Sequence, residues 1–459
     1  MSLRPRIQAM LRHVSSDGVF KRLVHNATLL FASNSVATLL HTAQVVLLTR
    51  YLQVDGYGQL VLIQSVVALV NEFFDVRIGE TTIKFGSVYL VRRDSVRLAA
   101  VVKLSYVVDL LTGVLAIVTV LVVSNWIATA YLHNSQLASL LQLYALALQF
   151  STVDATSQAV LRLTDRFRWL SMAAVTLGMF ELVVVTIAVL TTGDLRYVLM
   201  GLVLKSAIGA CLYLGLAAVA LQTQVGLRTF WSAPVSSIQH EYRALVRFVW
   251  HTNISMYLRM LNTRADVLIL GFFRGPTEVG VYKLALQIAS IVVRISDPFH
   301  SAILPDLSTL WAQRRLIAYR NLLRRLTLMM ALLLIPLALG VILASHWLMG
   351  WLVRPNVGAA NVTVAICSLA YLIAGIFFWA RPAAISMQRP EFNSWAGTLS
   401  VTAQTLSAVV LVPVWGGVGS AVALVINFAL VHPILLWQVR RFMAAAEVQP
   451  LPEVGHNAA

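Results

Sequence analysis

About twelve apolar segments, each long enough to cross a bilayer, account for most of this chain. A hydrocarbon core of about 30 Å takes roughly 20 helical residues, and lipid offers no partner for backbone N–H and C=O groups, so such segments fold as helices. The segments lie near residues 24–49, 57–77, 99–122, 137–158, 169–191, 197–222, 245–272, 279–303, 326–348, 358–379, 393–413 and 416–438. Only 12% of the 459 residues are charged, which is too few to solvate a soluble protein. The sequence therefore predicts an all-α polytopic membrane protein.

Lysine and arginine alternate from one side of these segments to the other. When residues near the end of a segment are counted with the adjoining connection, 25 of the 35 Lys and Arg residues fall at the two termini and in the connections that follow even-numbered segments, and only five fall in the other connections. Cytoplasmic loops are the ones that carry such an excess. The distribution predicts both termini in the cytoplasm. It also explains the net charge of +16 as a topology signal rather than a nucleic-acid surface.

Twelve segments divide into two halves of six. A shift of 222 residues places Gly58 on Gly280 and Asp75 on Asp297, and the order of features repeats. Halves of six enter the membrane from the same side, so they would be parallel repeats around a central cavity. The predicted organisation is a basic cytoplasmic segment at 1–23, six-helix lobes at 24–222 and 245–438, an inter-lobe linker at 223–244 and a cytoplasmic tail at 439–459.

The seventh segment carries polar residues along one helical face. They are spaced by three or four residues and are, in order, His251, Ser255, Arg259, Asn262 and Asp266. A charge at mid-bilayer costs at least ~2.5–3.5 kcal/mol on insertion scales, so this stripe indicates a water-filled pathway. Local pairing of Arg259 with Asp266, or of Arg294 with Asp297, is the alternative.

Acidic residues also fall inside the segments of the first half. Asp109, Asp154 and Glu181 lie at or near mid-helix, where burial favours capture of a proton or another cation. We expect the ion-coupling residues to be among Asp109, Asp154, Glu181, Asp266 and Asp297. The two cysteines, Cys211 and Cys367, lie in apolar runs, so we predict neither a metal site nor a disulfide framework.

Two stretches are more specific than the topology. Residues 48–60 read LTRYLQVDGYGQL, and residues 265–285 read ADVLILGFFRGPTEVGVYKLA. Both resemble the polysaccharide transporter family, the Wzx-like O-antigen and exopolysaccharide flippases of the multidrug/oligosaccharidyl-lipid/polysaccharide exporter superfamily. The second stretch matches that family at Asp266, Gly271, Gly275, Val279, Gly280, Tyr282 and Ala285. The first departs from it at Gln53, where glycine is usual.

This resemblance implies a flippase that moves undecaprenyl-diphosphate-linked oligosaccharide across the bacterial cytoplasmic membrane by alternating access, for lipopolysaccharide or another surface polysaccharide. Arginine forks suit a diphosphate, so the expected diphosphate site is Arg259, Arg264 and Arg294. The side chains expected to bind sugar hydroxyls are Asn34, His41, Gln44, His251, Ser255 and Asn262. The implied partners are the lipid-linked oligosaccharide, the bilayer, H⁺ or Na⁺, and polysaccharide polymerase machinery, with no cofactor and no nucleic acid.

Two other classes of function compete with this one. A drug or cation antiporter of the same superfamily would need net acidic binding residues, which the arginines of the seventh segment disfavour. A membrane glycosyltransferase or polymerase would need a long external loop, and the external connections here are short. The chain also has no G-x-x-x-x-G-K-[ST] phosphate loop. We therefore expect a transporter and not an enzyme, with the antiporter as the alternative.

Overall fold

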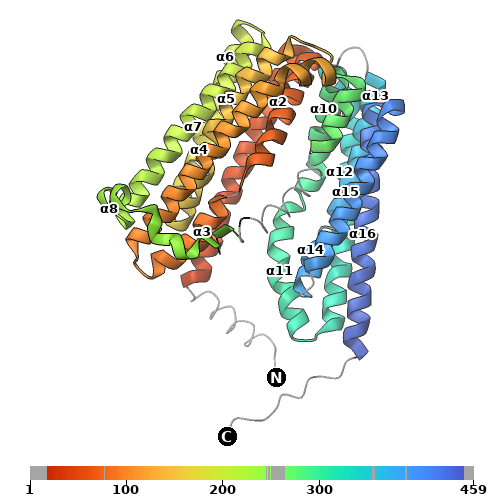
Figure 1. Ribbon diagram of the computed structural model, residues 1–459. Helices are drawn as coiled ribbons and strands as arrows, with labels where there is room; N and C mark the ends of the chain where they lie inside the picture. Colours follow the sequence, from red (N-terminus) through yellow and green to blue (C-terminus); the bar gives the residue numbers. More distant parts are fainter. Residues whose placement is uncertain are drawn as a thin grey trace. The chain divides into compact units, whose positions relative to one another are not determined.

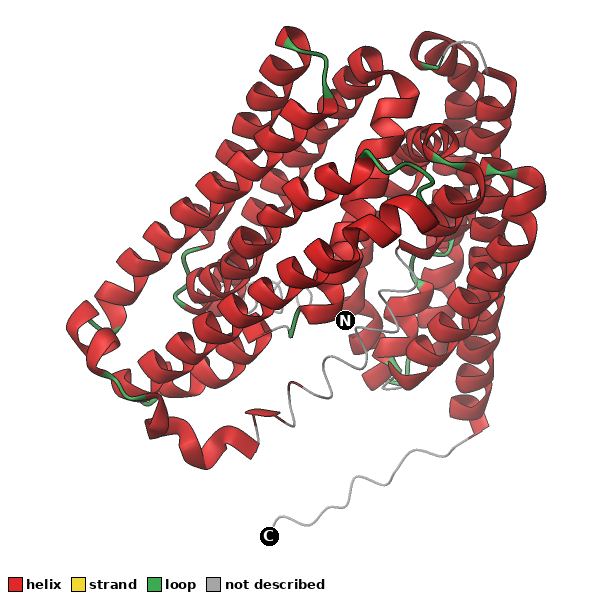
Figure 2. Ribbon diagram, turned by 45° about the horizontal axis from the view of Figure 1, so that its top comes forward, coloured by secondary structure: helices red, strands yellow, loops and turns green. Residues whose placement is uncertain are grey.

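The computed structural model describes residues 18–76, 78–243, 245–246, 249, 264–353, 357–387 and 390–448. In this part of the chain the regular elements are helices, and none is a strand (Figure 2). Eight of the described helical stretches are long and apolar enough to cross a membrane. The predicted all-α polytopic membrane protein is confirmed.

Contacts divide the chain into two units (Figure 1). Unit 1 comprises Met1–Leu52 and Ile63–Tyr257, and unit 2 comprises Gln53–Leu62 and Leu258–Ala459. Residues 53–62, which begin at the kink inside α2 (Gly18–Phe74), therefore belong to unit 2, while the residues on both sides of them belong to unit 1. The predicted lobe bounds stay a prediction.

Unit 1 is a bundle in which α5 packs against both α4 and α7. Its elements are α2 (Gly18–Phe74), α3 (Ile78–Val91), α4 (Ser95–Trp126), the π-helical η1 (Ile127–Tyr131), α5 (Leu137–Leu163), α6 (Phe167–Thr191), α7 (Leu195–Gln224), α8 (Leu227–Ser232) and the 3-10 element η2 (Val235–Glu241). Ala99 and Ala100 on α4, and Ala217 and Ala220 on α7, are fully buried. Small residues of this kind let membrane helices approach closely.

In unit 2, α13 packs against α10, α12 and α16. The elements are a helix at 264–274, then α10 (Pro276–Arg294), α11 (Asp297–Ala312), α12 (Leu316–Leu352), α13 (Val357–Ile376), α14 (Ala380–Ser386), α15 (Pro390–Trp415) and α16 (Gly417–Val448). The described parts of the predicted segments lie mainly within helices, with two differences. Segments 24–49 and 57–77 share the element α2, and segment 279–303 is divided between α10 and α11.

Large apolar side chains cover the outside of both units. Leu343 on α12 is 78% exposed and Val122 on α4 is 74% exposed, which only a lipid environment makes favourable. Exposed tryptophans stand toward the ends of the spans or in the connections, at Trp126, Trp231, Trp347, Trp395 and Trp437. Tryptophan is enriched at the membrane–water interface, so these rings are suited to anchor the helix ends there.

Helix α2 is interrupted at Gln53. The backbone of this residue has φ 61° and ψ 175°, a conformation that is essentially restricted to glycine. This is the position at which the family pattern has glycine, so the backbone keeps the conformation that the family's usual residue allows. The second half of α2 begins at this break.

The turn at 274–280 holds the connection between α15 and α16 through main-chain atoms. The guanidinium of Arg274 donates to the carbonyl oxygens of Pro413 and Val414, at 2.6 and 2.8 Å. The carboxylate of Glu278 accepts a hydrogen bond from the N–H of Gly417 at 2.7 Å. Carbonyls at a helix end and N–H groups at a helix start otherwise lack partners. Arg274 and Glu278 therefore cap the end of α15 and the start of α16.

The same turn packs against the start of the second half of α2. The hydroxyl of Thr277 donates to Asp55 at 2.7 Å. A Cβ on Gly58 would overlap the carbonyl oxygen of Pro276, and a Cβ on Gly280 would overlap the carbonyl oxygen of Val54. Only glycine permits this backbone approach at either position.

Candidate functional site

A polar network lies inside unit 1, among helices that are otherwise apolar. Glu181 on α6 accepts a hydrogen bond from the side chain of Gln44 on α2, with Oε1 and Nε2 3.2 Å apart. The other carboxylate oxygen of Glu181 lies 3.0 Å from the Nζ of Lys205 on α7. The two charges compensate each other, which lowers the cost of holding either one within a bilayer.

Asp154 on α5 lies beside the same ion pair. Lys205 is close enough to attract its carboxylate, and a Cβ at Gly209, one turn further along α7, would lie 3.6 Å from Oδ2 of Asp154. In the described part of the chain, Oδ1 of Asp154 has no hydrogen-bond partner. Two carboxylates therefore share one lysine, and the network carries a net negative charge when all three groups are ionised.

Asp109 lies at a different interface, between α4 and α5. It is only 5% exposed, and its carboxyl faces Thr156. Among the described residues, neither Oδ2 of Asp109 nor Oγ1 of Thr156 has a hydrogen-bond partner of good geometry. One turn earlier on α4, the hydroxyl of Tyr106 lies 3.0 Å from that of Ser157 on α5. The structure thus separates Asp109 from the pair of predicted coupling residues, Asp154 and Glu181, that gathers around Lys205.

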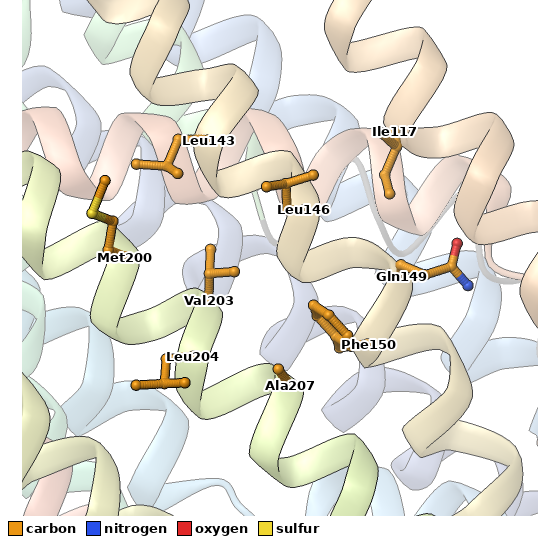
Figure 3. A pocket seen from close by; sticks show the side chains of 9 residues that line it. All are labelled: Ile117, Leu143, Leu146, Gln149, Phe150, Met200, Val203, Leu204 and Ala207. Atoms are coloured by element: carbon orange, nitrogen blue, oxygen red, sulfur yellow. The ribbon is translucent and has the colours of Figure 1, made fainter.

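A hollow of about 560 Å³ opens among α4, α5 and α7. Figure 3 shows its lining, which is apolar except for Gln149 on α5. None of the predicted site residues that the structure describes lines it. Such a surface suits a hydrocarbon chain and provides little for a sugar, a diphosphate or a cation to bind.

The residues of α2 predicted to bind sugar are dispersed. Asn34 and His41 are exposed, whereas Gln44 is buried in the network with Glu181. Their roles in sugar binding stay a prediction.

In unit 2 the described basic candidates differ in their burial. Arg264 is partly buried, and Arg294 is exposed at the end of α10, where its Nε donates to Ser290 Oγ at 3.3 Å. Asp297 is exposed at the start of α11. In the described structure Arg294 and Asp297 form no direct ion pair, although Arg294 is close enough to act on the carboxylate of Asp297, so local pairing of these two residues stays a prediction.

Asp266 is buried and fully engaged within unit 2. Its Oδ2 accepts a hydrogen bond from the hydroxyl of Tyr282 at 2.8 Å, and its Oδ1 accepts one from the N–H of Val267, also at 2.8 Å. Asp266 and Tyr282 both belong to the stretch 265–285, so the two motif residues bind each other. This contact gives Asp266 a structural role beside the ion-coupling role that we predict for it.

Four predicted residues of the seventh segment lie outside the described residues. They are His251, Ser255, Arg259 and Asn262.

Sequence reasoning missed the role of Lys103, a lone lysine within the apolar segment of α4. Its Nζ donates to the carbonyl oxygens of Trp231 and Ala233, at 3.0 and 2.8 Å, and lies 5.7 Å from the ring centroid of Phe230. The lysine thus caps the end of α8 and holds this part of the connection onto α4. The only sequence signal for this role is the presence of a charged residue inside an apolar segment.

The described residues include no group of three His, Cys, Asp or Glu side chains that could hold a metal ion. The charged groups above can bind and release cations or anions, and none is arranged as a nucleophile with its base.

Comparison with known proteins gives consistent results. A protein family described as "Polysaccharide biosynthesis protein" matches residues 23–311. The chain is 21% identical over 276 residues to the inner membrane protein YghQ of Escherichia coli (strain K12), which covers 60% of this chain and 77% of that protein. It is 25% identical over 201 residues to the probable flippase AglR of Haloferax volcanii, which covers 43% of this chain and 41% of that protein.

Solved structures share the fold. An inward-facing multidrug resistance MATE family transporter of the MOP superfamily has a TM-score of 0.71 at 12% identity, covering 91% of this chain and 99% of that one. The lipid II flippase MurJ, in an inward closed conformation, has a TM-score of 0.66 at 14% identity, covering 92% and 90%. At these identities the likeness concerns the fold alone.

Proposed function

Because the chain belongs to the polysaccharide biosynthesis protein family, whose relatives here include named flippases, we propose that it moves a lipid-linked oligosaccharide of the undecaprenyl-diphosphate type across the bacterial cytoplasmic membrane. The observation that carries this proposal is the family match over residues 23–311, which includes both sequence motifs and the polar stripe of the seventh segment. Movement would occur by alternating access, with no bond made or broken in the substrate.

The proposed diphosphate site is Arg259, with Arg264 and Arg294 assisting. A guanidinium is permanently charged and can donate two parallel hydrogen bonds to phosphate oxygens. The proposed sugar-binding side chains are Asn34, His41, Gln44, His251, Ser255 and Asn262. Arginine on the transport pathway also favours an anionic lipid-linked substrate over the cationic drugs of an antiporter.

The proposed energy source is an ion gradient of H⁺ or Na⁺. Buried carboxylates of unit 1 support this, since Asp109 and Asp154 have oxygens without a hydrogen-bond partner in the described structure. Asp266 and Asp297 remain candidates in unit 2. In the cell the protein would lie in the cytoplasmic membrane with both termini inside, and it would deliver its substrate to polysaccharide polymerase machinery.

Arg259→Ala tests the substrate site. We expect this variant to reach the membrane at normal levels and to abolish surface polysaccharide in a complementation assay, because the diphosphate loses its permanent cation. Arg259→Lys keeps the charge without the fork and should restore part of the production. The matched control is Arg320→Ala, which removes an exposed arginine of α12 and should leave production normal. Full production by Arg259→Ala would refute the diphosphate assignment.

A further inference from the structure

The buried face of α4 carries one polar side chain whose bonding is incomplete. The face includes Ser105, Asp109, Gly113, Ala116, Val120 and Ser124, spaced by three or four residues. The hydroxyl of Ser105 is 2.7 Å from that of Thr82, and the hydroxyl of Ser124 accepts a hydrogen bond from Gln142 at 2.8 Å. Asp109 is also buried, yet its Oδ2 has no hydrogen-bond partner of good geometry in the described part of the chain, although its carboxyl faces Thr156.

The two lysines inside the membrane spans of unit 1, Lys103 and Lys205, bind other groups. Lys103, on the same helix, donates to the carbonyl oxygens of the connection around α8, and Lys205 pairs with Glu181. No cationic side chain among the described residues forms an ion pair with Asp109. The charged residue that acts on it is Asp75, another anion.

The other groups facing Asp109 do not supply a positive charge. Tyr106 on α4 is bonded to Ser157, and the nearest side chain of α5 is the neutral Thr156. Asp154 acts on Tyr106, as Asp109 does. A carboxylate buried without a cation, and repelled by a second carboxylate, is strongly disfavoured as an isolated anion. An unpaired buried polar atom in a native protein calls for an explanation, and a bound ion is one of those known.

We propose that the α4–α5 interface binds one monovalent cation, a proton or Na⁺, on the carboxylate of Asp109, with Thr156 Oγ1 as a second oxygen. Further oxygens lie along the same face of α5, at Thr152 and Gln149, and both side chains contact the position of Gly113 one turn beyond Asp109. Oxygen atoms of this kind are the ligands that hard cations prefer. Gly113 leaves the room that these side chains occupy, because a Cβ there would lie 2.8 Å from Thr152 Oγ1.

This site distinguishes Asp109 from the other predicted coupling residues. Glu181 already has the ammonium of Lys205 at 3.0 Å, and Asp154 shares that lysine. Asp109 therefore needs a bound cation, whereas Glu181 does not. The assignment of this cation as the coupling ion rests on the proposed function, but its binding does not.

The test uses the purified full-length protein in detergent, without glycan. Binding of ²²Na⁺ is measured by scintillation proximity, and the protonated carboxyl is followed by infrared difference spectroscopy. We expect wild type to show one of these signals at neutral pH, and Asp109→Asn to lose one equivalent of it. The matched control is Asp94→Asn at the start of the same helix, where asparagine also caps a helix, and its signal should equal that of wild type.

Thr156→Val separates the two cations and also covers the case in which Asp109→Asn does not fold. If the cation is Na⁺, losing this hydroxyl should weaken ²²Na⁺ binding roughly tenfold. If it is a proton, the carboxyl band should remain and shift, because its hydroxyl neighbour is gone. The proposal is overturned if wild type shows neither signal, or if both variants retain the wild-type signal unchanged.

These readouts are independent of transport. If Asp109 binds its cation while the protein proves to have no part in polysaccharide production, the proposed function fails and the site stands. If complementation depends on Arg259 while Asp109→Asn binds cations as wild type does, the site fails and the function stands.

Discussion

At the scale of single residues, the backbone of Gln53 is strained. Gln53 occupies a backbone region that costs a side-chain-bearing residue about 1–3 kcal/mol, and the surrounding structure holds it there. The break lies where the chain passes from unit 1 to unit 2. Strained conformations are found at ligand clamps and switch regions, and a position joining two units of a transporter fits that pattern.

Gln53→Gly should raise the midpoint of thermal unfolding. Glycine adopts φ 61° without a steric penalty, so the variant should gain up to about 1–3 kcal/mol of stability. Gln53→Ala keeps the penalty and serves as the control. Differential scanning fluorimetry of the purified proteins measures both, and a lower midpoint for the glycine variant than for the alanine variant would contradict the strain.

The acidic residues of the polar network in unit 1 were predictable from the sequence, but their pairing was not. Asp109, Asp154 and Glu181 stand out because apolar spans rarely contain carboxylates. The spacing of residues along one helix, however, does not predict which residues of another helix they contact. The Glu181–Lys205 ion pair joins α6 to α7, so only the packed structure separates a neutralised carboxylate from an isolated one.

Helices that cross the membrane were more predictable from the sequence than the connections between them. Apolar length is enough to place a spanning helix, and most of the described helices follow the predicted segments, whereas α3 and α14 lie outside them. The connection after α7 lacks that signal. Rather than running free, α8 and η2 pack against α4, and Ala233 and Ile238 enter the buried core of unit 1.

Lys103→Met should release α8 from α4. The substitution removes two hydrogen bonds from a charged donor, worth about 1.5–3 kcal/mol each. Cleavage by trypsin after Arg228, an exposed residue of α8, should become faster. Lys84→Met removes an exposed lysine from α3 and should leave this cleavage unchanged. Equal rates in the two variants would show that the lysine does not hold the connection.

For the whole molecule, the contact between residues 54–58 and 276–280 bears on the predicted repeat. Gly58 meets the carbonyl of Pro276, and Gly280 meets the carbonyl of Val54. Under the shift of 222 residues, positions 54 and 58 correspond to 276 and 280. The contact of Gly58 with Pro276 and the contact of Gly280 with Val54 are therefore equivalent, with the two halves exchanged. A two-fold axis produces this kind of exchange. The repeat stays a prediction, and this exchange is a structural argument for it.

Gly58→Ala and Gly280→Ala should therefore be destabilising to a similar extent. Each new methyl group overlaps a backbone oxygen, and overpacking of this kind typically costs about 1–3 kcal/mol. Gly340→Ala is the matched control, since a Cβ on this residue of α12 meets no atom within 4 Å. Thermal unfolding in detergent measures the three variants. A large difference between the first two would argue against equivalent environments.

The caps supplied by Arg274 and Glu278 have a consequence for mutational tolerance. Both side chains bind main-chain atoms of the connection between α15 and α16, and every amino acid offers the same carbonyl oxygen. Side chains at 412–415 can therefore vary with little effect on the caps, as a saturation library would reveal. Gly416 is the exception, because its φ is +56° and a Cβ there would overlap the carboxylate of Glu278. Substitutions in this loop are limited by its backbone conformation and not by the identity of its side chains.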